Sequence, residues 1–350
     1  MRHSAQAQHV ATYGIDIGKN LFHVAGLDKA GRPQLRTKFK RDTLLQFFAN
    51  VPLALIAMEA CPGSQWLARK LQANGHLVRI IPAQFVKPYV KSNKNDSVDA
   101  EAIAEAATRP TMRFVTVKRV DQVDVQALHR ARDMMVYQRT ALICQMRGLL
   151  LEYGIAVRGG AGAFKSNLPR VIEDAENELT PSMRQLLAML RQHLNELESH
   201  IQQLSEKVAA LADLDDVARR LMTIPGIGAL AATALLAAVG DARQFKRGRD
   251  LSAWLGLVPA QHSTGGKPTL LGISKRGNSY VRRLLIHGAR TCVMHLDRNR
   301  NRLGAWLEQL GERAHFNKVT VAMANKMARM AWAVITRPGA LYQRNDPRYA

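Results

Sequence analysis

An uninterrupted heptad pattern between residues 183 and 211 constrains the fold of this 350-residue chain more than any other feature. Apolar residues recur there at alternating steps of four and three: Met183, Leu187, Leu190, Leu194, Leu197, Ile201, Leu204, Val208 and Leu211. Thr180 and Pro181, a cap residue followed by proline in the first turn, mark the start of a helix. The pattern predicts a long coiled-coil helix. Its partner is left open between the helix expected over 121–153 and another copy of the chain.

The charge of the chain follows its segments. The net charge is +22, and residues 1–120 contain 18 Lys and Arg against 8 Asp and Glu. Residues 121–215 contain 10 against 13, and residues 216–350 contain 22 against 7. We interpret these segments as three domains, with two basic ends around a near-neutral helical middle. A basic surface of this kind is typical of proteins that bind nucleic acid.

The composition places the chain among globular intracellular proteins. Hydrophobic residues make up 47% of the chain and charged residues 22%, which argues against disorder. Cys61, Cys144 and Cys292 have neither disulfide nor metal-ligand spacing, which favours a reducing, cytoplasmic compartment. No window approaches the roughly 20 apolar residues of a membrane helix, and the first residues lack the apolar run of a signal peptide. We therefore expect no membrane partner.

The first third alternates strand and helix patterns. Residues 11–40 read as three antiparallel strands joined by short turns. "DTLLQFFANV" and "GSQWLARKLQANG" have helical spacing, whereas "LALIAMEA" and "HLVRIIP" are short buried strands. The order predicts a mixed α/β sheet with helices around it. After the 121–153 helix, "RGGAGAFKSNLP" is the one segment that looks flexible.

Four carboxylates in the basic first third are candidate metal ligands. Asp96 and Asp99 share one helix face if a helix begins near Ser97. Asp16 lies within a predicted strand and Glu59 at the end of one, where an unneutralised carboxylate is costly. A divalent cation such as Mg²⁺ relieves that cost. The alternative is structural: Asp96 caps the helix, Asp99 favours its positive end, and the strand residues face water.

"IPGIG" suggests a phosphate contact in the last third, which we expect to be mainly helical. Gly226 and Gly228 before a helix expose backbone N–H groups. With a second helix near "DLSAWLGL", the segment resembles a helix-hairpin-helix, and Lys246, Arg247 and Arg249 nearby favour phosphate binding. The alternative is a tight helix–helix turn that requires small residues.

Ser263 in "HSTGGK" is a candidate nucleophile on a Gly-rich turn. A serine hydroxyl attacks phosphate only when its proton is removed and the charge of the phosphate is neutralised. The cations that follow it meet the second need: Lys267, Lys275, Arg276, Arg282 and Arg283. The alternative is a solvated Ser/Thr turn. His262 is adjacent in sequence only, and no histidine is assigned a role.

Five motifs in order carry a family resemblance over about residues 12–340: "GIDIGK", "AMEACPGS", "KNDSVDAEAIAEAA", "IPGIGALAATALLAAVGD" and "LGLVPAQHSTGGKPTLLGISKRGNSYVRRLLIHGA". The first third resembles the RuvC-like branch of the RNase H fold. The whole chain resembles the DEDD insertion-sequence transposases, also called bridge-RNA-guided recombinases.

The resemblance implies a site and partners. Asp16, Glu59, Asp96 and Asp99 would bind Mg²⁺, and Ser263 would attack DNA to form a phosphoserine link. A structured non-coding RNA would pair with target and donor DNA in a tetramer whose serine and metal sites meet between subunits. The setting implied is the bacterial cytoplasm, at the nucleoid.

Two rival functions stay open at this point. A RuvC-like nuclease, such as a junction resolvase, would use the same four acids with water in place of Ser263. A non-catalytic assembly factor for RNA and DNA would need neither the four acids nor Ser263. A sugar kinase, which "GIDIGK" alone would allow, is excluded by the charge and by the missing ATP-binding signals.

Overall fold

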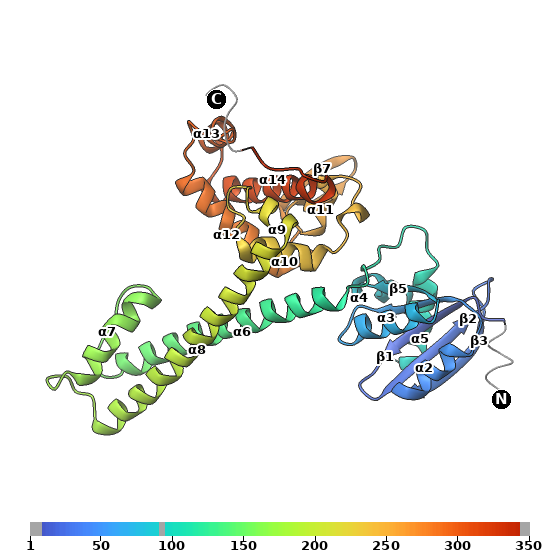
Figure 1. Cartoon of the computed structure of the whole chain (residues 1–350), viewed down its shortest axis with the longest axis horizontal. Helices are drawn as coiled ribbons and strands as arrows, with labels where there is room; N and C mark the ends of the chain where they lie inside the picture. The colour runs from blue at the N-terminus through green and yellow to red at the C-terminus, as the bar shows by residue number, and fades with distance from the viewer. Residues whose placement is uncertain (1–8, 91–94, 344–350) are drawn as a thin grey trace. The chain divides into compact units, whose positions relative to one another are not determined.

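The computed structural model describes residues 9–90 and 95–343 (Figure 1). The chain divides into two compact units, Met1–Arg119 and Val120–Ala350. The further division of the second unit at residue 215 stays a prediction. Among the helices of the described residues, none has the length and apolarity of a membrane span.

The first unit is a five-stranded sheet with helices on both faces, as the alternating patterns predict. Its elements are β1 (Thr12–Ile17), β2 (Leu21–Leu27), β3 (Pro33–Lys40), α2 (Arg41–Ala49), β4 (Leu55–Glu59), α3 (Ser64–Ala73), β5 (Leu77–Ile81), α4 (Ala83–Val86), the 3₁₀ turn η1 (Lys87–Tyr89) and α5 (Asp96–Ala107). The strand order is β3-β2-β1-β4-β5. The first three strands are antiparallel, and β1, β4 and β5 are parallel. This mixed sheet fits an RNase H-like domain.

The period of two in β1 and β4 separates the two faces of the sheet. Tyr13 and Ile15 of β1 are fully buried in the core that contains α2 and α3. Ala57 of β4 belongs instead to the core formed with the alanine-rich α5. Residues that alternate with the large apolar ones therefore face α5. Small side chains on this face let a helix lie close to the strands.

The second unit is mainly helical. Its elements are α6 (Val120–Leu151), α7 (Ala161–Glu173), α8 (Pro181–Leu214), α9 (Asp216–Leu221), α10 (Ala229–Val239), the 3₁₀ turn η2 (Ala242–Gln244), α11 (Gly248–Trp254), β6 (Pro259–Thr264), β7 (Lys267–Ile273), α12 (Ser279–His295), α13 (Gly304–Arg313) and α14 (Phe316–Thr336). Helices α9–α14 enclose one apolar core, and the β6–β7 hairpin extends from it.

The heptad seam of α8 packs against α6 of the same chain (Figure 1). Leu187, Leu194 and Leu197 of α8 are buried with Met146 and Leu150 of α6. Within the chain, the seam thus packs against the first of the two partners considered above. The supercoiled form of this pair stays a prediction.

The segment that looked flexible is a helix. α7 contains Pro169, and its Phe164 and Leu168 are fully buried against α6 and α8. The expectation of flexibility was wrong because the glycines that suggested it lie in the first turn of the helix and before it. Two apolar residues four apart then anchor the helix.

His129 is buried where α6, α10 and α12 meet. Its Nδ1 lies 3.0 Å from the Tyr280 hydroxyl and its Nε2 3.0 Å from the Thr233 hydroxyl. Since Thr233 donates its own proton to the Ala229 carbonyl (2.7 Å), its oxygen accepts from His129 Nε2–H, and Nδ1 accepts from Tyr280. The neutral ring is thus fully satisfied, and a second ring proton would have no acceptor without rearrangement.

This histidine predicts an acid-sensitive unit. Burial, and then the charge of Arg132, lower the pKa of His129 from 6.5 to about 4. Between these values the unfolded chain binds the proton and the folded chain does not, so stability falls as the pH decreases from about 6.5 to about 4. We expect a loss of about 3 kcal/mol over the whole window, of which about 2 kcal/mol falls between pH 7.5 and pH 5. Urea unfolding at pH 7.5 and 5 measures it: His129→Gln should flatten the dependence, and the exposed His200→Gln should not.

Candidate active site

Asp16 and Glu59 end two neighbouring parallel strands. Ile15 of β1 pairs with Met58 of β4, so the next residue on each strand is one of the two acids. Both acids alternate with the large apolar residues and lie on the α5 face. Asp16 was expected in the middle of a strand, but it is the last residue but one of β1. The two carboxylates therefore leave the sheet at the same edge.

Asp96 and Asp99 form the first turn of α5, which begins at Asp96. The cap is Asn95, whose side-chain oxygen accepts a hydrogen bond from the Ser97 amide at 3.0 Å. The interpretation of Asp96 as the cap was thus wrong. Lys94, in the motif that contains the pair, lies outside the described residues.

Gly14 allows α5 to lie directly on β1. A Cβ at this position would stand 2.0 Å from the Ala100 carbonyl oxygen and 2.6 Å from the Ala104 amide nitrogen. Only a residue without a side chain permits this contact, because both neighbours are backbone atoms of the helix. Ala100 directly follows Asp99, and Gly14 lies two residues before Asp16, so the contact brings the start of α5 next to the end of β1.

Three of the four acids, Asp16, Glu59 and Asp99, interact electrostatically. Burial, and then the charges of Asp16 and Asp99, raise the pKa of Glu59. Burial, followed by Glu59 and Asp16, likewise raises the pKa of the Cys61 thiol. Among the described residues, no three His, Cys, Asp or Glu side chains converge closely enough to chelate one ion as they stand. The carboxylates repel each other, and a divalent cation would neutralise their charge. Their oxygen donors suit Mg²⁺.

His23 lies beside the candidate acids, and sequence reasoning did not single it out. It pairs with Asp16 across the antiparallel β1–β2 ladder. Its Nδ1 lies 3.6 Å from Asp96 Oδ2, and its side chain is 14% exposed. The signal was present in the period of two, because His23 alternates with the buried Phe22 and Val24 and thus shares the face of Asp16. His23 links the strand acids to the start of α5.

Ser263 lies in the second unit, on a hairpin that is open to solvent. It is the last residue but one of β6 and pairs with Pro268 of β7, so it is a strand residue rather than part of the turn. Gly265 and Gly266 form the two-residue turn with φ of +55° and +76°. Gln261, two residues back on the same face, donates a hydrogen bond of 2.7 Å to Ser263 Oγ. This hydrogen bond orients the Ser263 hydroxyl, which accepts it, and leaves the hydroxyl proton available for donation.

Comparison with known proteins decides the family. A family model described as "Transposase IS116/IS110/IS902 family" matches residues 218–303, and a model of DEDD transposases, described as "Transposase", matches residues 13–155. The transposase for insertion sequence element IS1328 of Yersinia enterocolitica is 45% identical over 330 residues, 94% of this chain and 98% of the relative. The chain belongs to the IS110/IS116 family of insertion-sequence transposases. The transposase for IS1111A of Coxiella burnetii is also similar, 44% identical over 93% of this chain and 89% of its own length.

The cations that sequence reasoning assigned to nucleic acid have different surroundings in this transposase. Arg282 donates to the Leu255 and Arg276 carbonyls (3.0 and 3.1 Å), and Arg283 pairs with Asp133, so both have structural partners. Arg247 pairs with Asp250 at 3.5 Å and stays exposed. Five are exposed without an ion pair among the described residues: Lys246, Arg249, Lys267, Lys275 and Arg276. The last group is the one free to meet phosphate.

The "IPGIG" segment has a packing reason for its first glycine. Gly226 has a φ of +83°, and a Cβ there would stand 2.5 Å from the Gly288 carbonyl oxygen of α12. This contact favours the tight-turn interpretation for Gly226. Gly228 is exposed and precedes α10, so its position leaves the amide groups of that helix start open. Phosphate binding at this segment stays a prediction.

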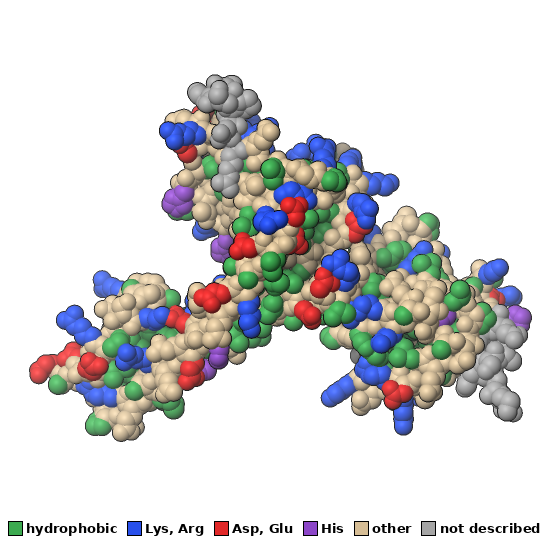
Figure 2. Space-filling view, in the orientation of Figure 1, with side chains coloured by type: hydrophobic (Ala, Val, Ile, Leu, Met, Phe, Trp, Pro, Cys, Tyr) green, Lys and Arg blue, Asp and Glu red, His purple; other side chains and the backbone are tan. Residues whose placement is uncertain are grey.

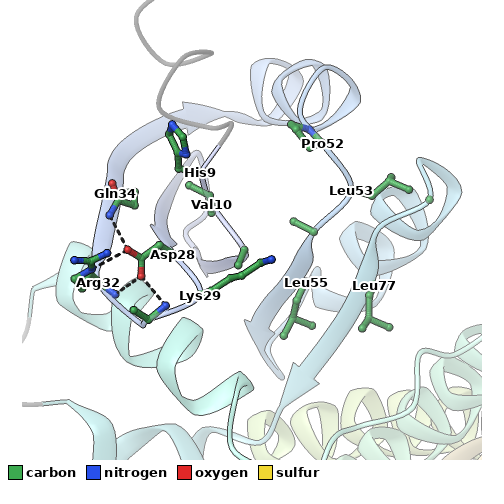
Figure 3. Close-up of a pocket in the computed structure, with 14 residues that line it drawn as sticks. His9, Val10, Asp28, Lys29, Arg32, Gln34, Pro52, Leu53, Leu55 and Leu77 are labelled. Carbon is green, nitrogen blue, oxygen red and sulfur yellow. Dashed lines mark hydrogen bonds and ion pairs between the residues drawn. The ribbon is translucent and has the colours of Figure 1, made fainter.

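The first unit also has a hollow of about 1060 Å³ (Figure 3). Its lining includes Leu55 and Leu77, the first residues of β4 and β5, whereas Glu59 ends β4. The hollow is therefore at the opposite edge of the sheet. Asp28, which accepts hydrogen bonds from Arg32 and Gln34, belongs to its wall and has no place in the acidic cluster.

Proposed function

We propose that this transposase cuts and rejoins DNA through a covalent phosphoserine intermediate at Ser263, with Asp16, Glu59, Asp96 and Asp99 as its metal-binding carboxylates. The observation that carries the proposal is the exposed Ser263 hydroxyl, held by Gln261 at 2.7 Å in a unit rich in surface cations. A serine so placed has no core to stabilise, which favours a chemical role.

Ser263 Oγ attacks the phosphorus of a phosphodiester and loses its proton. One bridging oxygen leaves with its strand and becomes a free hydroxyl. The serine phosphodiester that forms replaces the one that breaks, so a hydroxyl from another strand can attack it and restore Ser263. The number of phosphodiester bonds is unchanged in each step, and rejoining therefore needs no external energy source. This is recombination and not simple cleavage.

The carboxylates of the first unit are assigned the metal-binding role. The raised pKa of Glu59 reflects burial and the proximity of Asp16 and Asp99, a repulsion that a bound Mg²⁺ would relieve. When bound, the ion neutralises charge on the phosphate and on the leaving oxygen. The Nδ1 atom of His23 lies 3.6 Å from the Oδ2 atom of Asp96, the fourth acid. The exposed cations of the second unit contact the DNA backbone, which accords with its excess of Lys and Arg.

Sequence choice is assigned to RNA in this proposal. A structured non-coding RNA pairs with donor and target DNA, while the protein contacts mainly backbones, in accord with an aromatic content of only 6%. The assembly is a tetramer built from dimers, at the bacterial nucleoid. The exposed Gly228 and Lys246 add backbone contacts.

The proposal is tested by trapping the intermediate. The transposase is incubated with Mg²⁺, guide RNA and DNA that carries the element end, and then digested with trypsin and nuclease. Mass spectrometry should find a nucleotide on Ser263 in the peptide Asp250–Lys275, because trypsin does not cleave between Lys267 and Pro268. The adduct should be lost with EDTA and in Asp16→Asn. Strand breaks without any adduct would show that water is the nucleophile and would support a RuvC-like nuclease instead.

A further inference from the structure

A basic groove of about 1270 Å³ lies beside the hairpin that carries Ser263. Its floor and walls are apolar and come from β7, α13 and α14, with residues such as Leu271, Trp306 and Val321. Leu270 and Leu271 of β7, which both line the groove, are 66% and 56% exposed. The groove is thus an apolar slot that the chain itself leaves uncovered.

The rim of the groove is positively charged. Its lining contains five cations and, within the described residues, neither Asp nor Glu: Arg247, Arg249, Lys318, Lys326 and Arg329. The Lys326 ammonium lies 4.0 Å from the centre of the Trp306 ring. Burial, and then Arg329 and Arg302, lower the pKa of Lys326. Like charges are therefore crowded here, and a polyanion would relieve their repulsion. Figure 2 shows Lys and Arg side chains gathered over the β7 region.

An apolar slot with a cationic rim matches the two halves of an unpaired nucleotide. Bases stack on aromatic and apolar side chains, and their phosphates meet cations, in proteins that bind single strands. The bases of a duplex are stacked on each other and cannot enter such a slot. The groove exceeds the roughly 300–1000 Å³ of an ordinary small-molecule pocket, which gives room for more than one nucleotide.

The position of the groove connects it with Ser263. Pro259, the first residue of β6, lines the groove, and Ser263 lies four residues further along the same strand. At the rise of an extended strand this separation is about 13 Å. A DNA strand whose phosphate is at Ser263 can therefore place a base only a few nucleotides away in the groove.

We propose that this groove binds unpaired bases of the DNA strand that Ser263 attacks, with apolar contact at Trp306 and Leu271 and phosphate contact at Arg249 and Arg329. The inference rests on the proposed function for its choice of strand. The groove would hold the strand open next to the reacting phosphate, and it would favour DNA that is already melted at the exchange site.

Binding of fluorescent oligothymidylate by the Ser263→Ala protein tests the groove without any chemistry. Arg329→Glu should weaken binding about 10-fold and lower its salt dependence, because a phosphate contact is lost. Arg313→Glu is the matched control, since Arg313 is an exposed arginine of the same unit, at the end of α13 and outside the groove. It should change the affinity less than about 2-fold.

Photocrosslinking identifies the strand and its place. Oligonucleotides with 5-iodouracil should crosslink to peptides that line the groove, and single-stranded DNA should compete better than duplex. Equal losses from Arg329→Glu and Arg313→Glu, or crosslinks confined to other peptides, would overturn the proposal. Tighter binding of oligouridylate than of oligothymidylate would overturn it as well, since the groove would then serve RNA. Because the assay uses Ser263→Ala, a failure of the groove and a failure of the serine mechanism are seen separately.

Discussion

Ser263→Ala is expected to abolish strand exchange, with at least about a 10³-fold loss of rejoined product, because the atom that forms the covalent link is gone. The adduct in the peptide Asp250–Lys275 should disappear with it. Thermal stability should be unchanged within about 0.5 kcal/mol, since the side chain is exposed and packs against no core. Gel assays measure the strand-exchange product and the covalent adduct, and a melting curve measures the stability.

Thr264→Ala is the matched control for this variant. Thr264 is the next hydroxyl residue on the same exposed strand and pairs with Lys267, but its side chain alternates to the other face of the hairpin. Its loss should change exchange less than about 2-fold. If Thr264→Ala were inactive and Ser263→Ala active, the hydroxyl that reacts would be Thr264, and the assigned role of Gln261 would fall with it.

The sequence predicted the strands of the first unit well because their periodicity is strong. The alternation in "GIDIGK" and "LALIAMEA" places large residues on one face and small or acidic ones on the other, so Asp16 and Glu59 could be expected near each other. His23 follows the same rule and was missed, because histidines were judged by ligand spacing along the chain. Strand pairing, which brings His23 opposite Asp16, is not visible in that spacing.

The contacts that set the site were beyond sequence reasoning for a physical reason. A heptad seam shows which face of α8 is apolar, but it does not show that α6 covers it. "HSTGGK" predicts a turn, but the two glycines with positive φ form the whole turn and leave Ser263 in the strand. The groove beside the hairpin joins β7 to α13 and α14, elements that no local pattern connects. Tertiary packing decides each of these cases.

Gly14→Ala is expected to cost about 3 kcal/mol or more and to remove transposition. The new Cβ would stand 2.0 Å from the Ala100 carbonyl oxygen, and both close neighbours are helix backbone, so α5 must move as a body. That movement carries Asp96 and Asp99 away from Asp16 and Glu59. Amide hydrogen exchange in the first unit should become faster, since its α5 core would loosen. DNA strand-exchange activity should fall by at least about 10²-fold.

For Gly148→Ala we expect a stability change of opposite sign, although the substitution is the same. Gly148 is exposed within α6, and a Cβ there would meet nothing within 4 Å. Alanine in an exposed helix should stabilise the protein by about 0.5–1 kcal/mol, because it restricts the unfolded chain. Thermal melting of both variants beside the wild type checks the pair. A Gly14→Ala protein that melts with the wild type and stays active would mean that α5 does not rest on β1, and the acids of helix and strand would then have no reason to meet.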